Sequence, residues 1–410
     1  MALIVQKFGG TSVANIERIR NVAERVKRER DAGNQVVVVL SAMSGVTNQL
    51  VDYCTQASEL KTNEALAEYD AVISTGEQVT VGLLALVLQS QGIPARSWLG
   101  WQLPVKTDDV YSKARIDSIE TEALLAALKA GVVPVVPGFQ GVTPEGRITT
   151  LGRGGSDTSA VALAAALKAD QCDIYTDVDG VYTSDPRIVT KARKLKKVAY
   201  EEMLEMASLG AKVLQTRSVE MAMKHHVRLQ VLSSFSFEPG TLLVEEDEVL
   251  ERRLITGIAY SRSEARITLT QVPDSPGVAA AIFGPLAEQE INVDMIVQNV
   301  NASGKETDMT FTVPRTELAR AIAAIEGKKG ELKYGKLTTD ANVAKISVIG
   351  VGMKSHSGIA QKMFQTLAEK NINILVISTS EIKISVLIDE AYTELAIRSL
   401  HTAYGLDAGE

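Results

Sequence analysis

The pattern of hydrophobic and polar positions divides the chain into two parts. In the first 232 residues, short apolar runs alternate with longer stretches of helical periodicity. Residues 2–8 and 35–40 are apolar without strict alternation, which is typical of strands buried on both faces of a parallel sheet. Between them, apolar residues three and four positions apart predict a helix over about 15–30. Further strands are predicted near 132–136, 172–176 and 228–232. This order predicts an α/β fold with a mainly parallel central sheet between helices.

A change in composition marks the end of this part. The polar and turn-rich sequence SSFSFEPGT begins at Ser233, and the acidic run EEDEVLERR begins at Glu245. Clusters of turn residues followed by a run of like charges are typical of connections between domains. We therefore expect a domain boundary near residues 240–250.

The second part repeats itself. GVAAAIFGPLAEQEINV begins at Gly277 and GIAQKMFQTLAEKNINI at Gly358, an offset of 358 - 277 = 81 residues. Each copy has the order strand, helix, strand, strand, helix, which predicts a ferredoxin-like βαββαβ module. The second copy lacks a last strand, and we expect residues 255–260 to complete its sheet. The expected domains are 1–245, 265–340, and 246–264 together with 341–410.

Composition limits the classes of partner. Of the 410 residues, 43 are Lys or Arg and 50 are Asp or Glu, so the net charge of -7 favours neither nucleic acid nor an anionic membrane. Cys54 and Cys172 are too few for a disulfide framework. The N-terminus does not resemble a secretory signal, and the longest apolar run, near residues 82–88, is too short to span a membrane. A cytoplasmic location is expected, with no membrane and no nucleic-acid partner.

The sequence KFGGTS, residues 7–12, is the first candidate site. A pair of glycines between a parallel strand and a helix lets backbone N–H groups approach a phosphate, and Lys7 adds a full positive charge. A tight turn with a surface lysine is an equally simple interpretation. The usual P-loop, dinucleotide and protein-kinase glycine patterns are absent.

Hydroxyl and carboxyl groups follow the next strands. Ser41, Ser44 and Thr47 come after the strand at 35–40, where ligands of open α/β sheets bind, although one of them is expected to cap the following helix. Glu77 lies in the first turn of an apolar helix. Its default role is to interact with the helix dipole, and its alternative role is to bind an ammonium group.

The sequence LGRGGSD, ending at Asp157, precedes a strongly apolar helix that we expect Ser156 or Asp157 to cap. Three glycines and Arg153 at a helix N-terminus favour a carboxylate or phosphate site over a plain turn.

A loop rich in aspartate, YTDVDGVYTSDPR, follows the strand near 172–176. Its spacing does not match a calcium-binding EF-hand, because no glutamate closes the loop, and no metal site is expected. The loop could cover a nucleotide, with Arg187 near the phosphates. Lys212, among apolar neighbours, would be interpreted from the sequence alone as a lysine with a buried stem. The four histidines form no motif, so phosphoryl transfer is favoured over nucleophilic hydrolysis.

Six motifs in this order, KFGGTS, SAMSGVTN, STGE, GRGGSD, YTDVDGVYTSDPR and GAKVL, followed by a doubled module, closely resemble the aspartate kinases. That family has an amino-acid kinase fold followed by two ACT domains. The resemblance implies transfer of the γ-phosphoryl group of ATP, accompanied by Mg²⁺, to the side-chain carboxylate of L-aspartate. It also implies the first step of lysine, threonine and methionine biosynthesis.

The resemblance also implies roles for individual residues. It implies catalytic roles for Lys7, Arg153 and Asp157. It implies contacts to aspartate for Ser41, Thr47, Glu77, Arg153 and Ser156. The residues implied to bind ATP are Lys7, Phe8, Gly9, Gly10, Thr176, Asp177, Tyr182, Arg187, Lys212 and Val213.

In the same family, pairs of ACT domains bind amino acids. Lysine, threonine or both are therefore expected to inhibit the enzyme. The candidate effector contacts are Asp274, Gly277, Ala279, Asn292, Asp294, Gln298, Asn373, Ser380 and Glu381. VPDSPG in the first copy becomes the longer VGMKSHSG in the second, so the two copies are not expected to bind effector identically. A homo-oligomer, or an assembly with a shorter ACT-only subunit, is expected.

Two alternatives remain. Another amino-acid kinase would share the phosphate chemistry and differ in its acceptor, which the paired modules and the GRGGSD sequence argue against. An amino-acid sensor that has lost catalysis is disfavoured because Lys7, Arg153 and Asp157 are all present.

Overall fold

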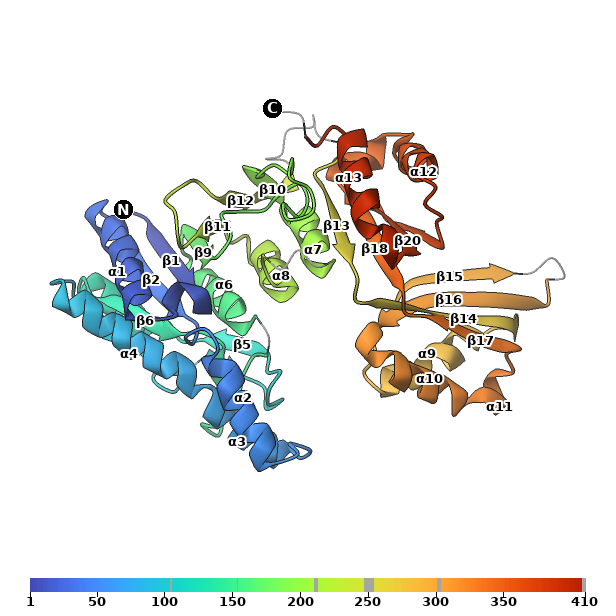
Figure 1. Cartoon of the computed structure of the whole chain (residues 1–410). Coiled ribbons are helices and arrows are strands. Elements are labelled where there is room, and N and C mark those ends of the chain that lie inside the picture. The colour runs from blue at the N-terminus through green and yellow to red at the C-terminus, as the bar shows by residue number, and fades with distance from the viewer. Residues whose placement is uncertain (104, 153, 210–212, 247–253, 301–303, 408–410) are drawn as a thin grey trace. The chain divides into compact units, whose positions relative to one another are not determined.

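The computed structural model describes residues 1–103, 105–152, 154–209, 213–246, 254–300 and 304–407 (Figure 1). These residues form two compact units. One comprises 1–181, 194–208 and 213–246, and the other comprises 182–193, 209 and 254–407. Segment 182–193, which interrupts the first unit in the sequence, therefore makes its contacts with the second.

The first unit is built on an eight-stranded sheet with the order β10-β12-β11-β9-β1-β2-β6-β3. Every neighbouring pair is parallel except β11 and β12. The strands are β1 (Leu3–Phe8), β2 (Gln35–Leu40), β3 (Ala95–Ser97), β6 (Val133–Pro137), β9 (Gln171–Thr176), β10 (Lys197–Ala199), β11 (Leu229–Ser233) and β12 (Thr241–Val244). The predicted parallel sheet is confirmed, because strands without alternation are buried on both faces.

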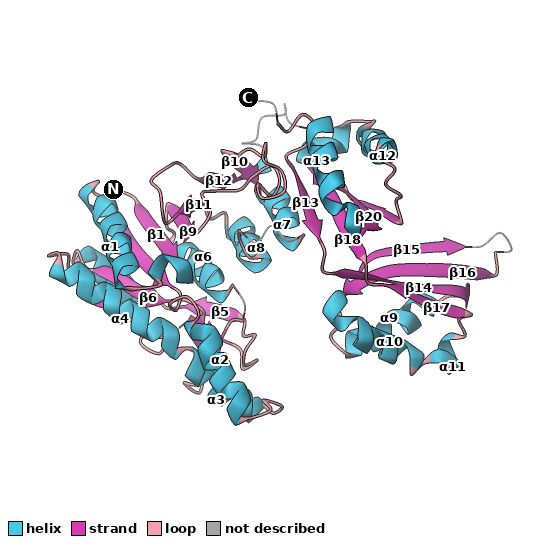
Figure 2. Cartoon of the chain, in the orientation of Figure 1, coloured by secondary structure: helices cyan, strands magenta, loops and turns pink. Residues whose placement is uncertain are grey.

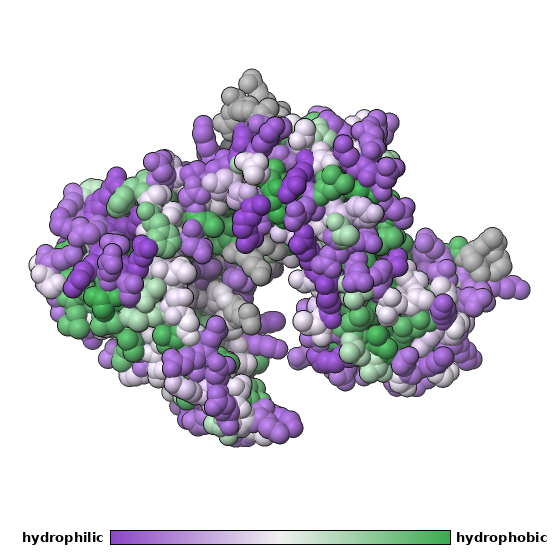
Figure 3. All heavy atoms as spheres, in the orientation of Figure 1, coloured by the Kyte–Doolittle hydropathy of each residue, from purple (hydrophilic) through white to green (hydrophobic). Residues whose placement is uncertain are grey.

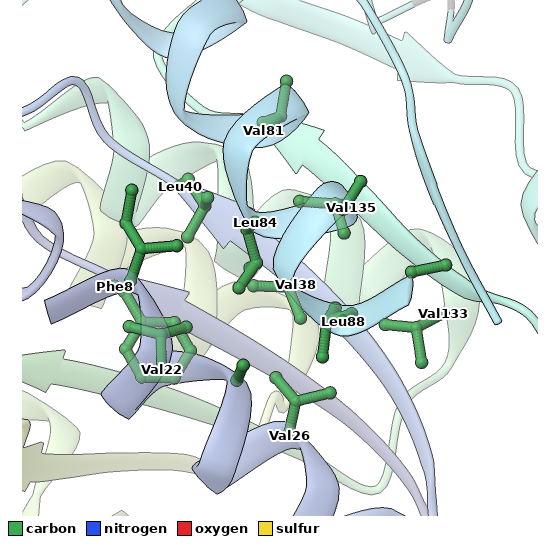
Figure 4. Packing of buried hydrophobic residues seen from close by; sticks show 14 of the residues in the cluster. Phe8, Val22, Val26, Val38, Leu40, Val81, Leu84, Leu88, Val133 and Val135 are labelled. Carbon is green, nitrogen blue, oxygen red and sulfur yellow. The ribbon is translucent and has the colours of Figure 1, made fainter. Parts of the chain in front are cut away.

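Helices cover this sheet (Figure 2). They are α1 (Ile16–Asp31), α2 (Val46–Ala57), α3 (Asn63–Ile73), α4 (Thr75–Ser90), α5 (Glu122–Lys129), α6 (Gly155–Leu167), α7 (Tyr200–Ser208) and α8 (Thr216–His225). On one face, α1 and α4 pack over β1, β2 and β6. Figure 4 shows this core, in which Phe8, Val38, Leu84 and Leu88 are buried together. Lys7 alternates with Phe8 along β1, so its side chain lies on the other face, where α6 packs against β1.

Helices α3 and α4 together are long and apolar enough to cross a membrane by length and composition, although half of their most apolar stretch is buried. The buried side of α4 carries Val81, Leu84 and Leu88, which pack on the sheet, while Val79 and Leu86 are exposed. Figure 3 shows one face of the molecule, on which hydrophobic areas lie among a mostly hydrophilic surface. The sheet contacts explain the high hydropathy of α4 as that of a core helix.

The sequence did not predict a second, four-stranded sheet in this unit, with the order β5-β4-β7-β8. Its strands are β4 (Val105–Thr107), β5 (Ile116–Ile119), β7 (Gln140–Val142) and β8 (Ile148–Thr150). Each has only three or four residues, too few for a period of two to be recognised. The buried carboxylate of Asp70 anchors this sheet to α3: it accepts hydrogen bonds from the N–H and the hydroxyl of Thr150, at 2.7 and 2.6 Å, and from the Ser112 N–H at 2.9 Å.

The second unit contains two antiparallel sheets with the orders β15-β16-β14-β17 and β13-β18-β20-β19. Its strands are β13 (Gly257–Ser261), β14 (Glu264–Pro273), β15 (Asp294–Val300), β16 (Glu306–Pro314), β17 (Lys336–Asp340), β18 (Val343–Ile349), β19 (Val376–Thr379) and β20 (Lys383–Asp389). Its α-helices are α9 (Val278–Glu288), α10 (Leu318–Glu326), α11 (Lys329–Leu332), α12 (Ile359–Glu369) and α13 (Thr393–Ala403). The prediction that residues 255–260 add a strand to the sheet of the second copy is confirmed, because Gly257 of β13 pairs with Ile349 of β18.

The two copies of the module have the same local features and pack on each other. Gly277 and Gly358 are the N-caps of α9 and α12, and both have φ 93°, a left-handed conformation that favours glycine. A small apolar cluster of Met295, Val343, Val376 and Leu387 joins the copies. An ion pair between Asp294 of β15 and Lys345 of β18 lies beside it.

Candidate functional site

The centre of the candidate site is an ion pair between the central strand and the apolar helix α6. Lys7 Nζ on β1 lies 2.5 Å from Asp157 Oδ1 in the first turn of α6, and each side chain is only 10% exposed. Asp157 Oδ1 is buried and accepts no hydrogen bond from any described residue. Its negative charge is therefore balanced by the ion pair with the Lys7 ammonium group. The sequence predicted both residues, and the fold brings them together at the carboxyl end of β1.

The two glycines after β1 bring the backbone close to its neighbours. The N–H of Gly9 donates to the carbonyl of Tyr175 at 3.2 Å, and a Cβ at Gly10 would lie 3.0 Å from the carbonyl oxygen of Ala42. The chain then forms a short 3-10 helix, η1 (Gly10–Val13), before α1. Phe8 itself is fully buried, with its ring stacked on Tyr175, so its contribution is to the core beneath the turn.

The loop after β2 differs from the expected capping. The N-cap of α2 is Gly45, with φ 85° and no capping side chain, so none of Ser41, Ser44 and Thr47 caps this helix. Thr47 is half-buried in the first turn, and Ser41 is half-buried at the end of β2. The capping prediction was wrong because Gly45, in a left-handed conformation, occupies the N-cap position. None of the three hydroxyl groups is therefore used as the cap of α2.

Glu77 is buried in the first turn of α4, with 3% of its surface exposed. Its Oε1 accepts a hydrogen bond from the Ala42 N–H at 3.0 Å, and its Oε2 has no hydrogen-bond partner among the described residues. Burial raises the pKa of Glu77 to about 7. A carboxylate interacting only with the helix dipole would be exposed, so this buried and half-satisfied group is better suited to binding a cation.

The start of α6 also differs from the prediction. Its N-cap is Gly154, with φ 70°, and Ser156 and Asp157 both lie within the first turn and are buried. The expected cap was wrong because the Asp157 carboxylate pairs with Lys7. Gly155 packs tightly, since a Cβ there would come within 2.8 Å of the Phe139 ring. Arg153 lies outside the described residues.

The residues assigned to ATP fall in three places. Thr176 and Asp177 lie at the end of β9, next to β1, with Thr176 half-buried and Asp177 exposed. Tyr182 and Arg187 belong to segment 182–193 of the second unit, and the structure does not place them with Lys7. Val213 is half-buried before α8, and Lys212 lies outside the described residues.

Most candidate effector residues are exposed on the two modules. Asp274, Gly277, Asn292 and Gln298 of the first copy and Asn373, Ser380 and Glu381 of the second are exposed, and Ala279 is half-buried. Asp294 differs from these residues in forming an ion pair: its carboxylate contacts the buried ammonium group of Lys345 in the other copy. Partial burial favours the neutral carboxyl, but hydrogen bonding to Lys345 lowers the pKa of Asp294 overall.

Metal ligands are not gathered anywhere in the described part of the chain, where no three His, Cys, Asp or Glu residues could hold an ion together. A cavity of about 270 Å³ lies between α1, β9 and β11 and includes Asp173, Tyr175 and Arg25. Tyr175 pairs in register with Phe8, so this cavity is on the opposite face of the sheet from Lys7. It is therefore separate from the candidate site.

Sequence reasoning missed the buried groups that support the site. Asp70 and Gln140 were not predicted, although the Gln140 side-chain amide donates to the carbonyl of Ser74, just before α4, at 2.9 Å. A signal existed for Asp70, since a charged residue on the apolar side of an amphipathic helix is rarely buried without partners. Gln140 gave no signal, because its strand is too short to recognise.

Comparison with known proteins identifies both parts of the chain. A model described as the amino acid kinase family matches residues 2–233, and one described as an ACT domain matches residues 267–328 and 346–404. The chain is 56% identical over 409 residues to an aspartate kinase of Stutzerimonas stutzeri (strain A1501), covering 100% of this chain and 98% of the relative. It is 49% identical over 409 residues to an aspartokinase of Helicobacter pylori (strain 26695), covering 99% of this chain and 100% of the relative.

Solved structures agree with this comparison. The Escherichia coli aspartokinase III in complex with aspartate and ADP has a TM-score of 0.80 and 27% identity, with 98% of this chain and 99% of that chain covered. The same enzyme in complex with lysine and aspartate has a TM-score of 0.76.

Proposed function

The chain belongs to the amino acid kinase family and, within it, to the aspartate kinases, and from that premise we propose that it phosphorylates the side-chain carboxylate of L-aspartate with ATP. The observation that carries the proposal is the buried ion pair of Lys7 with Asp157 at the carboxyl end of β1. Ligands of open α/β sheets bind at this end of the strands.

In the reaction, an oxygen of the aspartate side chain attacks the γ-phosphorus, and the bond from that phosphorus to the β,γ-bridging oxygen breaks. An acyl phosphate and ADP result. A side-chain carboxylate is already ionised at neutral pH, so the nucleophile needs no general base. This agrees with the described residues of the site, which offer the Lys7 ammonium, hydroxyls and backbone N–H groups. Catalysis then depends on positioning the two anions and on neutralising charge.

Lys7 is proposed to neutralise charge on the phosphoryl group in the transition state, with Asp157 holding its ammonium in place before ATP binds. The backbone N–H groups at Gly9 and Gly10 would approach the phosphates. Support comes from the nearly complete burial of the Lys7 and Asp157 side chains, because a charge interaction is much stronger where water is excluded.

For aspartate, Glu77 is proposed to bind the ammonium group, Arg153 a carboxylate, and Ser41, Thr47 and Ser156 to complete the pocket. The unpartnered Oε2 of Glu77 supports the first assignment, since an ammonium group would supply the missing donor. The remaining proposed contacts to ATP are Thr176, Asp177, Tyr182, Arg187, Lys212 and Val213.

Mg²⁺ would accompany ATP. The described residues offer no cluster of ligands that could form an all-protein cage, which fits an ion held chiefly by nucleotide phosphates and water. Bound there, it would neutralise phosphate charge.

The paired modules are proposed to bind lysine, threonine or both and to inhibit the kinase, which would place the enzyme in the biosynthesis of those amino acids. A similar structure, Escherichia coli aspartokinase III, was solved with lysine and aspartate. Inhibition requires that the effector bind one state of the enzyme more tightly than another. Purified enzyme whose rate and aspartate KM ignore both amino acids would contradict this part.

We propose the domain limits 1–245, 265–340, and 246–264 with 341–410. We also propose a cytoplasmic homo-oligomer, or an assembly with a shorter subunit made of the modules alone. Exposed apolar residues on the edge strands, Ile296 and Val300 on β15 and Ile377 on β19, support association through the modules. Sedimentation of the purified protein tests this association.

A further inference from the structure

The cavity on the α1 side of the sheet has no part in the proposed reaction. It lies within the first unit, on the face of the sheet opposite Lys7, and its volume is about 270 Å³. A water molecule occupies roughly 30 Å³ in the liquid, so the cavity has room for a small organic molecule. Its walls are formed by α1, β9, β11 and the chain that follows β11.

A buried carboxyl group without a cationic partner forms part of the wall. Asp173 of β9 is 4% exposed, and its Oδ1 accepts a hydrogen bond from Gln171 Nε2 at 2.6 Å. No described residue donates a hydrogen bond to its Oδ2 or forms an ion pair with it. Burial raises the pKa of Asp173 to about 7, and the nearby charge of Glu29 on α1 adds to this increase. Such costly groups are concentrated at sites that bind ligands.

A buried guanidinium group without an acidic partner forms another part of the wall. Arg25 of α1 is 7% exposed and forms no ion pair with any described residue. It donates a hydrogen bond to the carbonyl of Ser236 at 2.7 Å. Its guanidinium group lies 5.0 Å from the centre of the Tyr175 ring and 4.4 Å from that of the Phe237 ring. A guanidinium group has five N–H donors, more than these contacts use.

The two groups lie at different levels of the cavity. Helix α1 connects the parallel strands β1 and β2, so it runs against the strand direction. Arg25 lies beside Tyr175. Glu29, four residues later on α1, interacts with Asp173, two residues earlier on β9. Four residues of helix and two residues of strand each span about 6–7 Å. The cavity therefore has a cationic level and an acidic level about one helical turn apart.

This arrangement is complementary to a molecule that carries both charges. An α-amino acid has a carboxylate and an ammonium group on one carbon, so the two groups reach the two levels through hydrogen bonds of about 2.8 Å. A simple anion or a simple amine would leave one of the buried charged residues without a partner. Ile4 and Leu232 add apolar surface to the same cavity, which favours a short apolar side chain.

We propose that this cavity is a binding site for a free α-amino acid with a short apolar side chain, whose carboxylate pairs with Arg25 and whose ammonium group pairs with Asp173 and Glu29. All of these residues lie in the first unit. The inference does not rest on the proposed function, because none of them has a part in the proposed reaction.

Isothermal titration calorimetry of the full chain with L-valine at pH 8, above the pKa of Asp173, tests the site. Isovalerate lacks only the ammonium group of L-valine, and isobutylamine lacks only the carboxylate. Each should bind at least about tenfold more weakly than L-valine, because each loses the hydrogen bonds of one charged group. The titrations are made with excess L-aspartate, ADP, L-lysine and L-threonine, which occupy the proposed catalytic and effector sites.

Variants at each level test the assigned contacts. Asp173→Asn should raise the Kd for L-valine about tenfold but not the Kd for isovalerate, which has no ammonium group. Arg25→Gln should raise the Kd for L-valine but not the Kd for isobutylamine. Asp173→Asn is the decisive variant, because it should not lower the melting temperature, whereas Arg25→Gln also removes the stacking on two aromatic rings. Glu17→Gln, at an exposed acidic position on α1, is the matched control.

Two results would overturn the inference at the wild-type stage. One is the absence of L-valine binding at millimolar concentration. The other is equal affinity for L-valine and isovalerate, which would indicate a site for a simple anion. Binding of L-valine that Asp173→Asn does not weaken would also overturn it, because the amino acid would then occupy another part of the chain.

Discussion

Lys7 Nζ on the central strand lies 2.5 Å from Asp157 Oδ1 on α6, and both side chains are nine-tenths buried. The fold thus joins a cation after the first strand to a carboxylate from the middle of the kinase sequence. A buried pair of this kind is costly to form and is weak evidence for stability. Its position at the carboxyl ends of the strands favours a catalytic reason for keeping it.

The first prediction contrasts Lys7 with Arg153. Lys7→Ala should lower kcat about a hundredfold or more, because the lost charge acts on the transition state. Arg153→Ala should mainly raise the KM for aspartate. Steady-state kinetics with both substrates measures this difference, and Lys27→Ala, which removes a half-buried lysine on α1 that is paired with Asp31, is the control. The same change in both parameters for both variants would contradict the assigned roles.

The second prediction concerns Glu77. Burial raises its pKa from 4.5 to about 7, so in the empty pocket the carboxyl is neutral below pH 7 and charged above it. Only the charged form attracts the ammonium of aspartate. The KM for aspartate should therefore rise as the pH falls from 8 to 6, by up to about tenfold per pH unit below 7. Glu77→Gln should have a high KM at pH 8 that changes little with pH. A wild-type KM that is flat over this range would show that Glu77 does not bind the ammonium group.

The third prediction tests the anchor of the small sheet. Asp70→Ala leaves three donors, the Thr150 N–H and hydroxyl and the Ser112 N–H, without their acceptor. Unpaired buried donors cost about 1–3 kcal/mol each, so the first unit should lose about 3 kcal/mol or more. Thermal unfolding should show a drop of roughly 6–12 °C. The exposed Asp52→Ala is the control, and a loss no greater than that control would argue against the network.

The fourth prediction concerns Asp173, which is buried in β9 on the α1 side of the sheet. Burial raises its pKa from 3.8 to about 7. Because the folded state favours the neutral acid, Asp173 destabilises the fold increasingly as the pH rises from about 4 to 7, by up to about 4 kcal/mol. Asp173→Asn, whose Oδ1 can still accept from Gln171, should raise the melting temperature at pH 8. That gain should disappear near pH 4, and a gain independent of pH would exclude this cause.

The sequence predicted the long elements well, and the physical reason is their burial. Residues 35–40 are apolar because β2 is covered on both faces, and the repeat at Gly277 and Gly358 stands out because both copies need a left-handed residue before their helix. The strand at 255–260 could be assigned to the second module because that module lacked a strand. Its pairing with β18 confirms the assignment.

What could not be predicted depends on contacts between distant segments. Gly154 is the N-cap of α6, and the Asp157 carboxylate pairs with Lys7 and does not cap the helix. Rules for helix capping consider only neighbours in the sequence, so they could not predict this pair. Likewise, the hydrogen bond between Thr183 and His401 joins residues far apart in the sequence, and neither belongs to a recognisable motif. The support for Glu77 as the ammonium ligand is its burial and its unpartnered Oε2, which depend on how α4 packs against the loop after β2.

Coupled ATP turnover by the purified full chain tests the proposed function most directly, with L-aspartate, with L-glutamate and with no acceptor, each repeated with lysine, threonine and both. We expect turnover that depends on aspartate and is suppressed by one or both amino acids. Turnover with glutamate alone would contradict the proposed acceptor. No turnover at all, together with tight binding of lysine or threonine, would contradict catalysis and favour an amino-acid sensor.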